Sequence, residues 1–303
     1  MTVISSTIIK AAAREAGFSA CGIAPAGELT EAKRLFMAAL AEGRQADMHF
    51  LEKDIDKRFN PELLLPGCRS VIVLTLDYRI ADKPASDKYR MARFTWIEDY
   101  HTLVKRKAQQ MLATLKEHCP DMQSRITVDS SCISEKNWAV MAGVGCIGKN
   151  SLVHNGQGSF FVIGTILTNC ATDAYDSPKN SDCGTCRRCI DHCPAHALEP
   201  YKLDAERCFA YQTIENKNTD FEIFKKSPLL FGCDCCQEVC PHNKKKIQPM
   251  PSVSESSLFL RLKNEDLETL TIEDFKTYFG NTPIARRKYD KMSRAILTKQ
   301  KTT

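Results

Sequence analysis

The sequence has no apolar run long enough to cross a membrane and no recognisable export signal. Its longest apolar stretches, 70–76 and 159–167, fall well short of the roughly 20 residues that a membrane-spanning helix needs. The N-terminus lacks a basic segment followed by a continuous apolar stretch, so we expect no signal peptide and a cytoplasmic location. Only 14 glycines and 13 prolines occur in 303 residues, and 43% of the residues are apolar, which excludes disordered and collagen-like chains.

Cysteine, by contrast, is abundant. The chain has 15 cysteines, and nine of them follow Cys170. Because the cytosol keeps thiols reduced, clustered cysteines in a chain without an export signal are more often metal ligands than disulfides. The net charge of +5 is only mildly basic, so it permits a nucleic-acid partner without requiring one.

Helical and strand patterns alternate through the first part of the chain and predict an α/β (α+β) domain over residues 1–175. Helical patterns are present at 6–16, 29–41 and 99–118, and strand patterns at 17–25, 70–78, 125–129 and 158–167. The polar segment 171–182 breaks this alternation just before the cysteines become dense. We therefore place a domain boundary there.

The first of two cysteine runs has the spacing C-x2-C-x2-C-x3-C-P, from Cys183 to Pro194. This spacing binds [4Fe-4S] clusters in two-cluster bacterial ferredoxins, where the fourth cysteine ligates the other cluster. The second run, C-x2-C-x3-C-P from Cys233 to Pro241, is one ligand short, and Cys208 is the natural candidate for the missing ligand. The predicted ligands are Cys183, Cys186, Cys189 and Cys240 for cluster 1, and Cys193, Cys208, Cys233 and Cys236 for cluster 2.

We therefore expect a ferredoxin-like domain with two [4Fe-4S] clusters over residues 176–250, followed by a basic helical tail over 251–303. Zinc also uses C-x2-C pairs, but it needs four ligands per ion and shows no preference for a cysteine–proline ending. Cys235 is left over between two ligands. The other six cysteines are expected to be small buried apolar residues, and they are Cys21, Cys68, Cys119, Cys132, Cys146 and Cys170. Because two clusters alone can only relay single electrons, the first domain must hold either the acceptor chemistry or a docking surface.

The segment 126–169 carries the candidate acceptor site. Asp129 is expected to end a strand. The glycines of G-x-G-x-x-G (143–148) precede Lys149, but Asn150 follows it, so the G-K-[ST] ending of a phosphate-binding loop is missing. The motif also precedes a strand rather than a helix, which disfavours a nucleotide site. Close approach of the backbone to a large flat cofactor is the better use of these glycines.

Taken together, these motifs closely resemble the epoxyqueuosine reductase family, cobalamin-dependent iron-sulfur enzymes that complete queuosine biosynthesis on tRNA. The resemblance runs through almost the whole chain. The segments that carry it are DKRFNPELLLPGCRSVIVLTLDY (56–78), EDYH (98–101), VDSSCISEKNWAVMAGVGCIGKNSL (128–152), CFAYQTIENK (208–217), FGCDCCQEVCPHN (231–243) and TIEDFKTYFGNTPIARRK (271–288).

The resemblance implies an enzyme that reduces and dehydrates the epoxide of epoxyqueuosine in the tRNA anticodon loop. Electrons from a low-potential donor of the flavodoxin or ferredoxin type would pass through the two clusters to cobalamin. We expect a monomer without membrane association.

By the same resemblance Asp129 is the proton donor and Lys217 is a tRNA contact. The implied cobalamin contacts are Arg58, Asp129, Val153, Cys233 and Asp234. A carboxyl that faces an apolar corrin can have its pKa raised toward neutrality, which suits a general acid. The alternatives from the residues alone are a helix N-cap for Asp129 and ordinary solvated charges for Arg58 and Lys217.

Basic residues in the tail are opposed only by Asp290. They suit phosphate contacts, or they form a solvated helical face. These residues are Arg286, Arg287, Lys288, Lys291, Arg294, Lys299 and Lys301. Five histidines lie in no motif that demands cobalt ligation and are expected to be ordinary polar residues or supports for ligands, namely His101, His154, His192, His196 and His242.

The chain departs from the family pattern at a few positions. Ser131 and Cys132 stand where the family commonly has a small residue and proline, Cys146 replaces the usual tryptophan, and Ala210 replaces the usual serine. The changes at Cys132 and Cys146 bring thiols near the expected corrin. The chain also stops at Thr303 without the C-terminal helical repeats that longer members use on tRNA, which affects the mode of tRNA binding more than the chemistry.

Two rival functions have distinct signatures. A cobalamin-dependent reductase of a small molecule, resembling the reductive dehalogenases, would not need tRNA. A ferredoxin-type electron-transfer protein would contain iron without cobalt, and it would leave Asp129 without a chemical role.

Overall fold

A computed structural model describes residues 3–80, 83–179, 183–218, 220–244 and 257–301. Its central sheet has the strand order β2 (Ala20–Pro25), β3 (Ser70–Asp77), β8 (Phe161–Thr168) and β5 (Ser124–Thr127). Every neighbouring pair is antiparallel. The expected domain of mixed helices and strands is confirmed, and the antiparallel pairing makes it an α+β domain.

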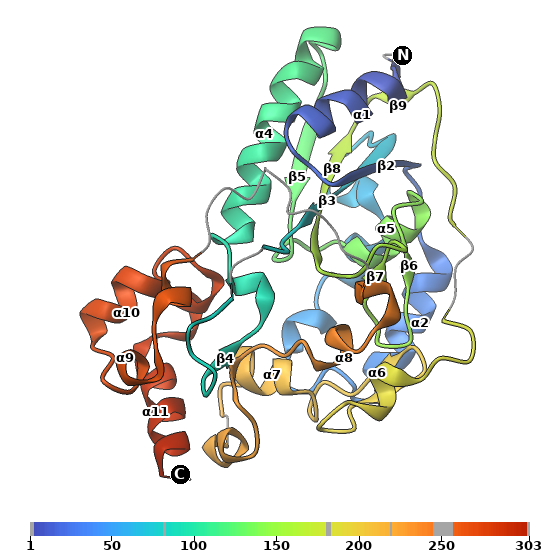
Figure 1. Ribbon diagram of the computed structural model, residues 1–303. Helices are drawn as coiled ribbons and strands as arrows, with labels where there is room; N and C mark the ends of the chain where they lie inside the picture. Colours follow the sequence, from blue (N-terminus) through green and yellow to red (C-terminus); the bar gives the residue numbers. More distant parts are fainter. Residues whose placement is uncertain (1–2, 81–82, 180–182, 219, 245–256, 302–303) are drawn as a thin grey trace.

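Helices cover both faces of this sheet (Figure 1). α1 (Ser6–Glu15) and α4 (Tyr100–His118) pack on one face, and α5 (Glu135–Met141) packs on the other. All of β3 is buried, and successive side chains of a strand point to opposite faces of the sheet. Ile72 therefore joins the core beneath α1 and α4, whereas Val73 joins the core beneath α5.

The strongest sequence patterns correspond to observed elements. The pattern at 29–41 forms α2 (Thr30–Ala41), and the pattern at 70–78 forms β3. β5 is shorter than expected because it ends at Thr127, so Asp129 lies beyond the strand in a loop. The domain's other short elements are β1 (Val3–Ile4), α3 (Ile55–Phe59), β4 (Arg90–Met91), β6 (Cys146–Ile147), β7 (Val153–His154) and β9 (Ala171–Thr172).

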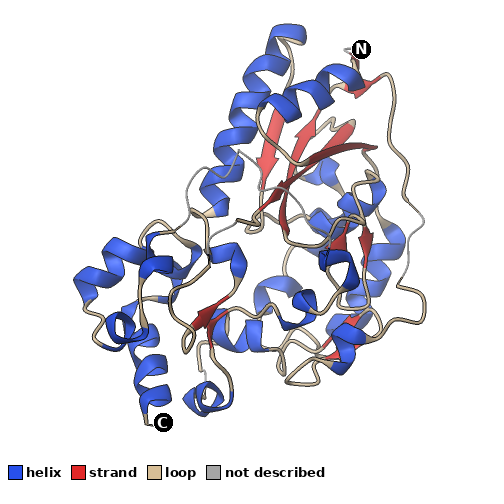
Figure 2. Ribbon diagram, viewed as in Figure 1, coloured by secondary structure: helices blue, strands red, loops and turns tan. Residues whose placement is uncertain are grey.

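The cysteine-rich segment contains only short elements among its described residues (Figure 2). They are α6 (Arg188–Asp191), β10 (Leu198–Glu199), β11 (Lys202–Leu203), α7 (Phe209–Ile214), β12 (Leu229–Phe231) and α8 (Cys235–Glu238). Short 3-10 helices are present at His49–Glu52, Pro61–Leu63, Arg93–Thr95, Phe221–Lys226, Pro241–Lys244, Leu258–Arg261 and Pro283–Arg287.

The C-terminal tail forms α9 (Asn264–Glu268), α10 (Ile272–Phe279) and α11 (Tyr289–Gln300). These helices share one buried core with Trp96 of the first part of the chain and Phe231 of the cysteine-rich segment. β12 also pairs in parallel with β4, which lies beside the tail in Figure 1. The predicted boundary at 250/251 lies outside the described residues. Within the described ranges, no helix is both long and apolar enough to span a bilayer.

Candidate active site and cluster sites

A cavity of about 360 Å³, here the apolar cavity, is lined by the sheet domain and by the cysteine-rich segment. All four predicted cluster-2 cysteines line it. Apolar and aromatic side chains form most of the remaining wall, including Tyr78, Phe94, Leu152, Phe161, Val162, Ile163 and Phe209. The structure thus brings together four residues that the sequence marks as cobalamin contacts, namely Asp129, Val153, Cys233 and Asp234.

A second cavity of about 620 Å³, here the basic cavity, adjoins the first. Its charged lining residues include Lys217, Arg286, Arg287, Lys288 and Lys291. Phe94, Tyr100 and Asp129 line both cavities, so the Asp129 carboxylate lies where the two meet.

Asp129 is held by two side chains from the start of α4. Tyr100 donates a hydrogen bond from its hydroxyl to Asp129 Oδ2 at 2.8 Å, and His101 Nε2 lies 2.9 Å from the same oxygen. The other ring nitrogen of His101 lies 2.6 Å from Oδ1 of Asp99, the N-cap of α4. The Asp129 backbone has a left-handed φ of 49°, and Arg286 Nη1 is 3.9 Å from its carboxylate.

The protonation of this cluster differs from the expectation for Asp129. Desolvation opposes ionisation of Asp129, but the hydrogen bonds from His101 and Tyr100 outweigh it and lower the pKa of the carboxyl. The expected upward shift is therefore wrong for this arrangement. Desolvation also works against the His101 imidazolium, yet Asp129 and Asp99 raise the pKa of His101 to about 9. At neutral pH the mobile proton of this cluster is consequently on His101.

Asp129 is not a helix N-cap, because α5 begins only at Glu135. Instead, the Asp129 backbone N–H donates a 2.6 Å hydrogen bond to Glu135 Oε1. Desolvation raises the pKa of Glu135 to about 8, so this carboxyl keeps its proton at neutral pH. The sequence predicted no role for Tyr100 or Glu135 and only an ordinary polar or supporting role for His101, although the EDYH segment contains Tyr100 and His101.

Two predicted residues lie away from the apolar cavity. Arg58 is on α3, where its guanidinium packs over the Phe36 ring at 5.5 Å and donates a 3.4 Å hydrogen bond to Phe50 O. It lines neither cavity. Lys217 lines the basic cavity, and its role as a tRNA contact stays a prediction.

The cluster-1 cysteines all line a separate cavity of about 80 Å³. Among the described residues, no three His, Cys, Asp or Glu side chains converge on a site for one metal ion. A zinc site would place four ligands within about 2.3 Å of one point. The predicted cluster-1 ligands do line one common cavity, as ligands of a shared cluster must.

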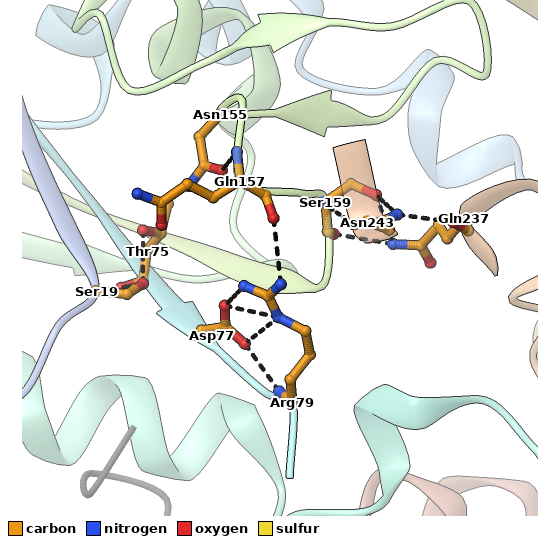
Figure 3. Close-up of polar contacts among 9 residues, drawn as sticks. All are labelled: Ser19, Thr75, Asp77, Arg79, Asn155, Gln157, Ser159, Gln237 and Asn243. Atoms are coloured by element: carbon orange, nitrogen blue, oxygen red, sulfur yellow. Dashed lines mark hydrogen bonds and ion pairs between the residues drawn. The ribbon is translucent and has the colours of Figure 1, made fainter. Parts of the chain in front are cut away.

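Contacts from the first domain position the cluster-1 cysteines. The Lys149 ammonium donates to Gly184 O at 2.5 Å and to Cys186 O at 3.1 Å, and the Lys149 backbone N–H lies 3.4 Å from Cys183 Sγ. A hydrogen-bonded group around Ser159 ties the second cysteine run to the start of β8 (Figure 3). Its partners are Gln237 and Asn243.

At Gly143 and Gly145 the close neighbour is the protein's own backbone, and neither glycine lines the apolar cavity, which corrects the role expected for these two. A Cβ at Gly143 would lie 2.5 Å from Ser177 O, and one at Gly145 would lie 2.5 Å from His154 O. Among the single cysteines, Cys21 and Cys132 are half-buried rather than buried as expected. Buried positions are confirmed for Cys68, Cys119, Cys146 and Cys170.

An α+β domain whose cavity is walled by cluster cysteines defines an iron-sulfur oxidoreductase. A model of the family "Epoxyqueuosine reductase QueG, DUF1730" matches residues 58–130, and a "4Fe-4S double cluster binding domain" matches 182–243. The epoxyqueuosine reductase of Cellulophaga algicola is 36% identical over 296 residues, which cover 96% of each chain. That of Leadbetterella byssophila is 34% identical over 292 residues, covering 95% of this chain and 96% of the relative. The chain belongs to the epoxyqueuosine reductase family.

Solved structures agree with this assignment. A crystal structure of selenomethionine-labelled epoxyqueuosine reductase has a TM-score of 0.87 and 28% identity, and the match covers 97% of this chain and 80% of that one. A crystal structure of epoxyqueuosine reductase with an epoxyqueuosine-modified tRNA-Tyr stem loop has a TM-score of 0.87 and 27% identity over the same shares. The chain therefore has the fold of this family over nearly its whole length.

Proposed function

We propose that this reductase converts epoxyqueuosine to queuosine in tRNA, with electrons passing from cluster 1 through cluster 2 to cobalamin in the apolar cavity. The observation that carries the proposal is the position of Asp129, where a cavity walled by cluster-2 cysteines meets a cavity lined by basic side chains. The first cavity suits a redox cofactor, and the second suits an anionic tRNA loop. The relative crystallised with a modified tRNA stem loop supports the same substrate.

The apolar cavity fits the flat ring of cobalamin in its chemistry. Its aromatic and aliphatic walls include Tyr78, Val153 and Phe161, and cluster 2 would lie in the same wall through its four cysteines. Buried Asp234 accepts a 2.7 Å hydrogen bond from the Arg93 backbone N–H, and desolvation raises the pKa of Asp234 to about 6. When bound, cobalamin supplies the low-potential reduction of the epoxide carbon.

The protein's own residues supply the protons. Conversion of the epoxide to an alkene consumes two electrons and two protons and releases the oxygen as water. The His101 imidazolium, 2.9 Å from Asp129 Oδ2, passes a proton to Asp129, which faces the substrate and protonates the epoxide oxygen. Tyr100 holds the carboxylate in position at 2.8 Å. Protonated Glu135 would be a nearby second proton store.

The test is an anaerobic reaction of the iron-reconstituted protein with epoxyqueuosine-containing tRNA, a low-potential reductant and cobalamin. Mass spectrometry of the digested nucleosides should show loss of one oxygen atom from the modified base, and only when cobalamin is present. An inactive protein with full iron content and bound cobalamin would overturn the tRNA assignment in favour of a small-molecule substrate.

The same assay tests Asp129. Asp129→Asn should lower kcat by roughly 10²–10⁴-fold, the usual contribution of general acid catalysis, with iron content and tRNA affinity unchanged. Asp121→Asn is the matched control, because Asp121 is exposed and lines neither cavity. Full activity of the Asp129→Asn variant would show that the proton comes from another group.

A further inference from the structure

We infer that His154 and His242 form a stacked pair that positions and tunes cluster 1 by donating an imidazole N–H to its sulfur atoms, which raises the reduction potential of this cluster. The inference rests on the proposed role of the cluster-1 cysteines as ligands. It identifies residues that set the reduction potential of the cluster at which electrons enter.

The two rings lie against each other at the cluster-1 cavity. Their centroids are 4.4 Å apart and their planes differ by 18°. Both residues line the 80 Å³ cavity, together with all four cluster-1 cysteines. The two histidines come from different parts of the chain, His154 from β7 and His242 from the 3-10 helix Pro241–Lys244 that follows Cys240.

His154 is buried without a hydrogen-bond partner. His154 is only 4% exposed, and neither ring nitrogen, Nδ1 or Nε2, has a hydrogen-bond partner among the described residues. Whatever its protonation state, an imidazole carries at least one N–H donor. Buried donors without an acceptor are rare in native proteins, so this ring points to an acceptor that completes the site. The cavity that it lines is the one that the cluster-1 cysteines enclose, and cluster sulfur atoms accept such hydrogen bonds.

Both histidines are fixed by their surroundings. His154 pairs with Cys146 across the β6–β7 hairpin, and a Cβ at Gly148 would lie only 3.3 Å from His154 Cδ2. His242 is followed by Asn243, whose Oδ1 accepts a 2.7 Å hydrogen bond from the Ser159 backbone N–H and whose Nδ2 donates to Ser159 Oγ at 3.0 Å (Figure 3). The ring pair is therefore held by two anchored segments, which is what a positioning role requires.

The two clusters differ in the groups around them. The cluster-1 cavity is lined by both imidazoles and by Lys149, whose ammonium contacts the carbonyls of Gly184 and Cys186. Among the described residues, the cluster-2 cysteines share their cavity with the acidic residues Asp129, Glu135 and Asp234 and with a single lysine, Lys136, and no histidine lines it. Hydrogen bonds to the sulfur atoms and nearby charge set iron-sulfur potentials. Loss of the imidazole donor should therefore lower the potential of cluster 1 and leave that of cluster 2 unchanged.

The test is a redox titration of the reconstituted full-length protein followed by EPR, with His154→Leu and His154→Asn compared with the wild type. His154→Leu should shift the reduction equilibrium of one cluster about tenfold toward the oxidised state, which is 59 mV for a one-electron couple. His154→Asn keeps an N–H donor and should recover most of the shift. His192→Leu is the matched control, because His192 is exposed and its Nδ1 lies 3.0 Å from Arg188 O.

A second measurement covers the case in which His154→Leu loses iron. Wild-type protein labelled with ¹⁵N-histidine should show a nitrogen coupling to a reduced cluster in pulsed EPR, and His242→Phe should preserve it because the phenyl ring keeps the stack. No coupling in the wild type, or an unshifted potential in iron-replete His154→Leu, would overturn the inference. Either of these two results is compatible with full activity on tRNA, so each would overturn the inference without touching the proposed function. Conversely, a wild-type protein that shows the coupling but does not act on tRNA would overturn the proposed function and leave the inference intact.

Discussion

In the proposed mechanism, proton delivery depends on His101. It links the N-cap carboxylate of α4 to Asp129, with ring nitrogens 2.6 Å from Asp99 and 2.9 Å from Asp129. Desolvation alone would favour the neutral ring, but the two carboxylates reverse this effect and raise the pKa of His101 to about 9. The chain thus keeps Asp129 ionised while holding a proton one hydrogen bond away.

This arrangement predicts a loss of activity at alkaline pH. kcat/KM should stay level through neutral pH and fall as the pH rises through about 9, because His101 then loses its proton. The same shift should contribute stability that is complete below pH 6.5, the ordinary pKa, and is lost as the pH rises through 9. A pH–rate profile measures this fall of kcat/KM at alkaline pH. The His101→Asn variant should be slower overall and should no longer show the fall. The His192→Asn control should still show it. An unchanged fall in His101→Asn would assign it to another group.

At the scale of elements, Gly232 joins β12 to the second cysteine run in a left-handed conformation. Its φ is 69°, and an added Cβ would lie 2.5 Å from Ala92 Cβ. Its backbone N–H also donates a 2.9 Å hydrogen bond to Thr213 Oγ1. This glycine lets the chain turn from the β4–β12 pair directly into Cys233.

Gly232→Ala should therefore lower the free energy of unfolding. The left-handed backbone alone costs an alanine about 1–2 kcal/mol, and overpacking against Ala92 adds about 1–3 kcal/mol. Gly156→Ala is the matched control, since Gly156 has a φ of 79° but no atom within 4 Å of the added Cβ. Urea unfolding should show a larger loss for Gly232→Ala, together with lower iron content. Equal losses for the two variants would show that Ala92 moves aside.

The sequence predicts the long helices and strands well, because in each of them the apolar residues follow one pattern over many positions. β3 is buried throughout, and the apolar run 70–78 indicates it directly. The β4–β12 pair could not be predicted, because strands of two and three residues that lie nearly half the chain apart leave no periodic pattern. The double-cluster domain could be predicted because the spacing of the cysteines encodes its chemistry. The hydrogen bonds from Tyr100 and His101 to Asp129 could not be predicted from the sequence. They depend on where α4 begins in space relative to the loop that follows β5.

At the scale of the molecule, the tail forms one wall of the basic cavity. Arg286 and Lys291 come from the tail, and Lys217 comes from the cysteine-rich segment. Three parts of the chain therefore meet around the expected tRNA loop, since Asp129 belongs to the first domain. The proposed tRNA site therefore draws on all three parts of the chain.

The salt dependence of tRNA binding tests this arrangement. Each of Lys217→Ala and Arg286→Gln should weaken binding and lower the slope of log K against log salt by about 0.7, the value for one phosphate contact on a single strand. Lys276→Ala is the control, because Lys276 is exposed on α10 and lines neither cavity. Slopes that match the wild type in both cavity variants would place the phosphates elsewhere.

Because the tail and the cysteine-rich segment share one core, we expect cluster retention to depend on α11. Met292 is 0% exposed in the core that contains Phe231, and β12 leads directly to Cys233. Met292→Ala should lower the free energy of unfolding by about 2–5 kcal/mol, the usual cost of truncating a buried side chain. Leu297→Ala on the same helix, where Leu297 is 50% exposed, should stay within about 0.5 kcal/mol.

Iron release followed beside circular dichroism in urea distinguishes a shared core from an independent tail. If the core is continuous, Met292→Ala moves the midpoints of iron release and helix loss to lower urea together, because loss of α11 removes support from β12. If α11 unfolded first while iron stayed bound at the wild-type midpoint, the tail would be an independent unit and the cluster region would be stable without it. The joint shift is expected, because Phe231 and Met292 belong to the same buried core.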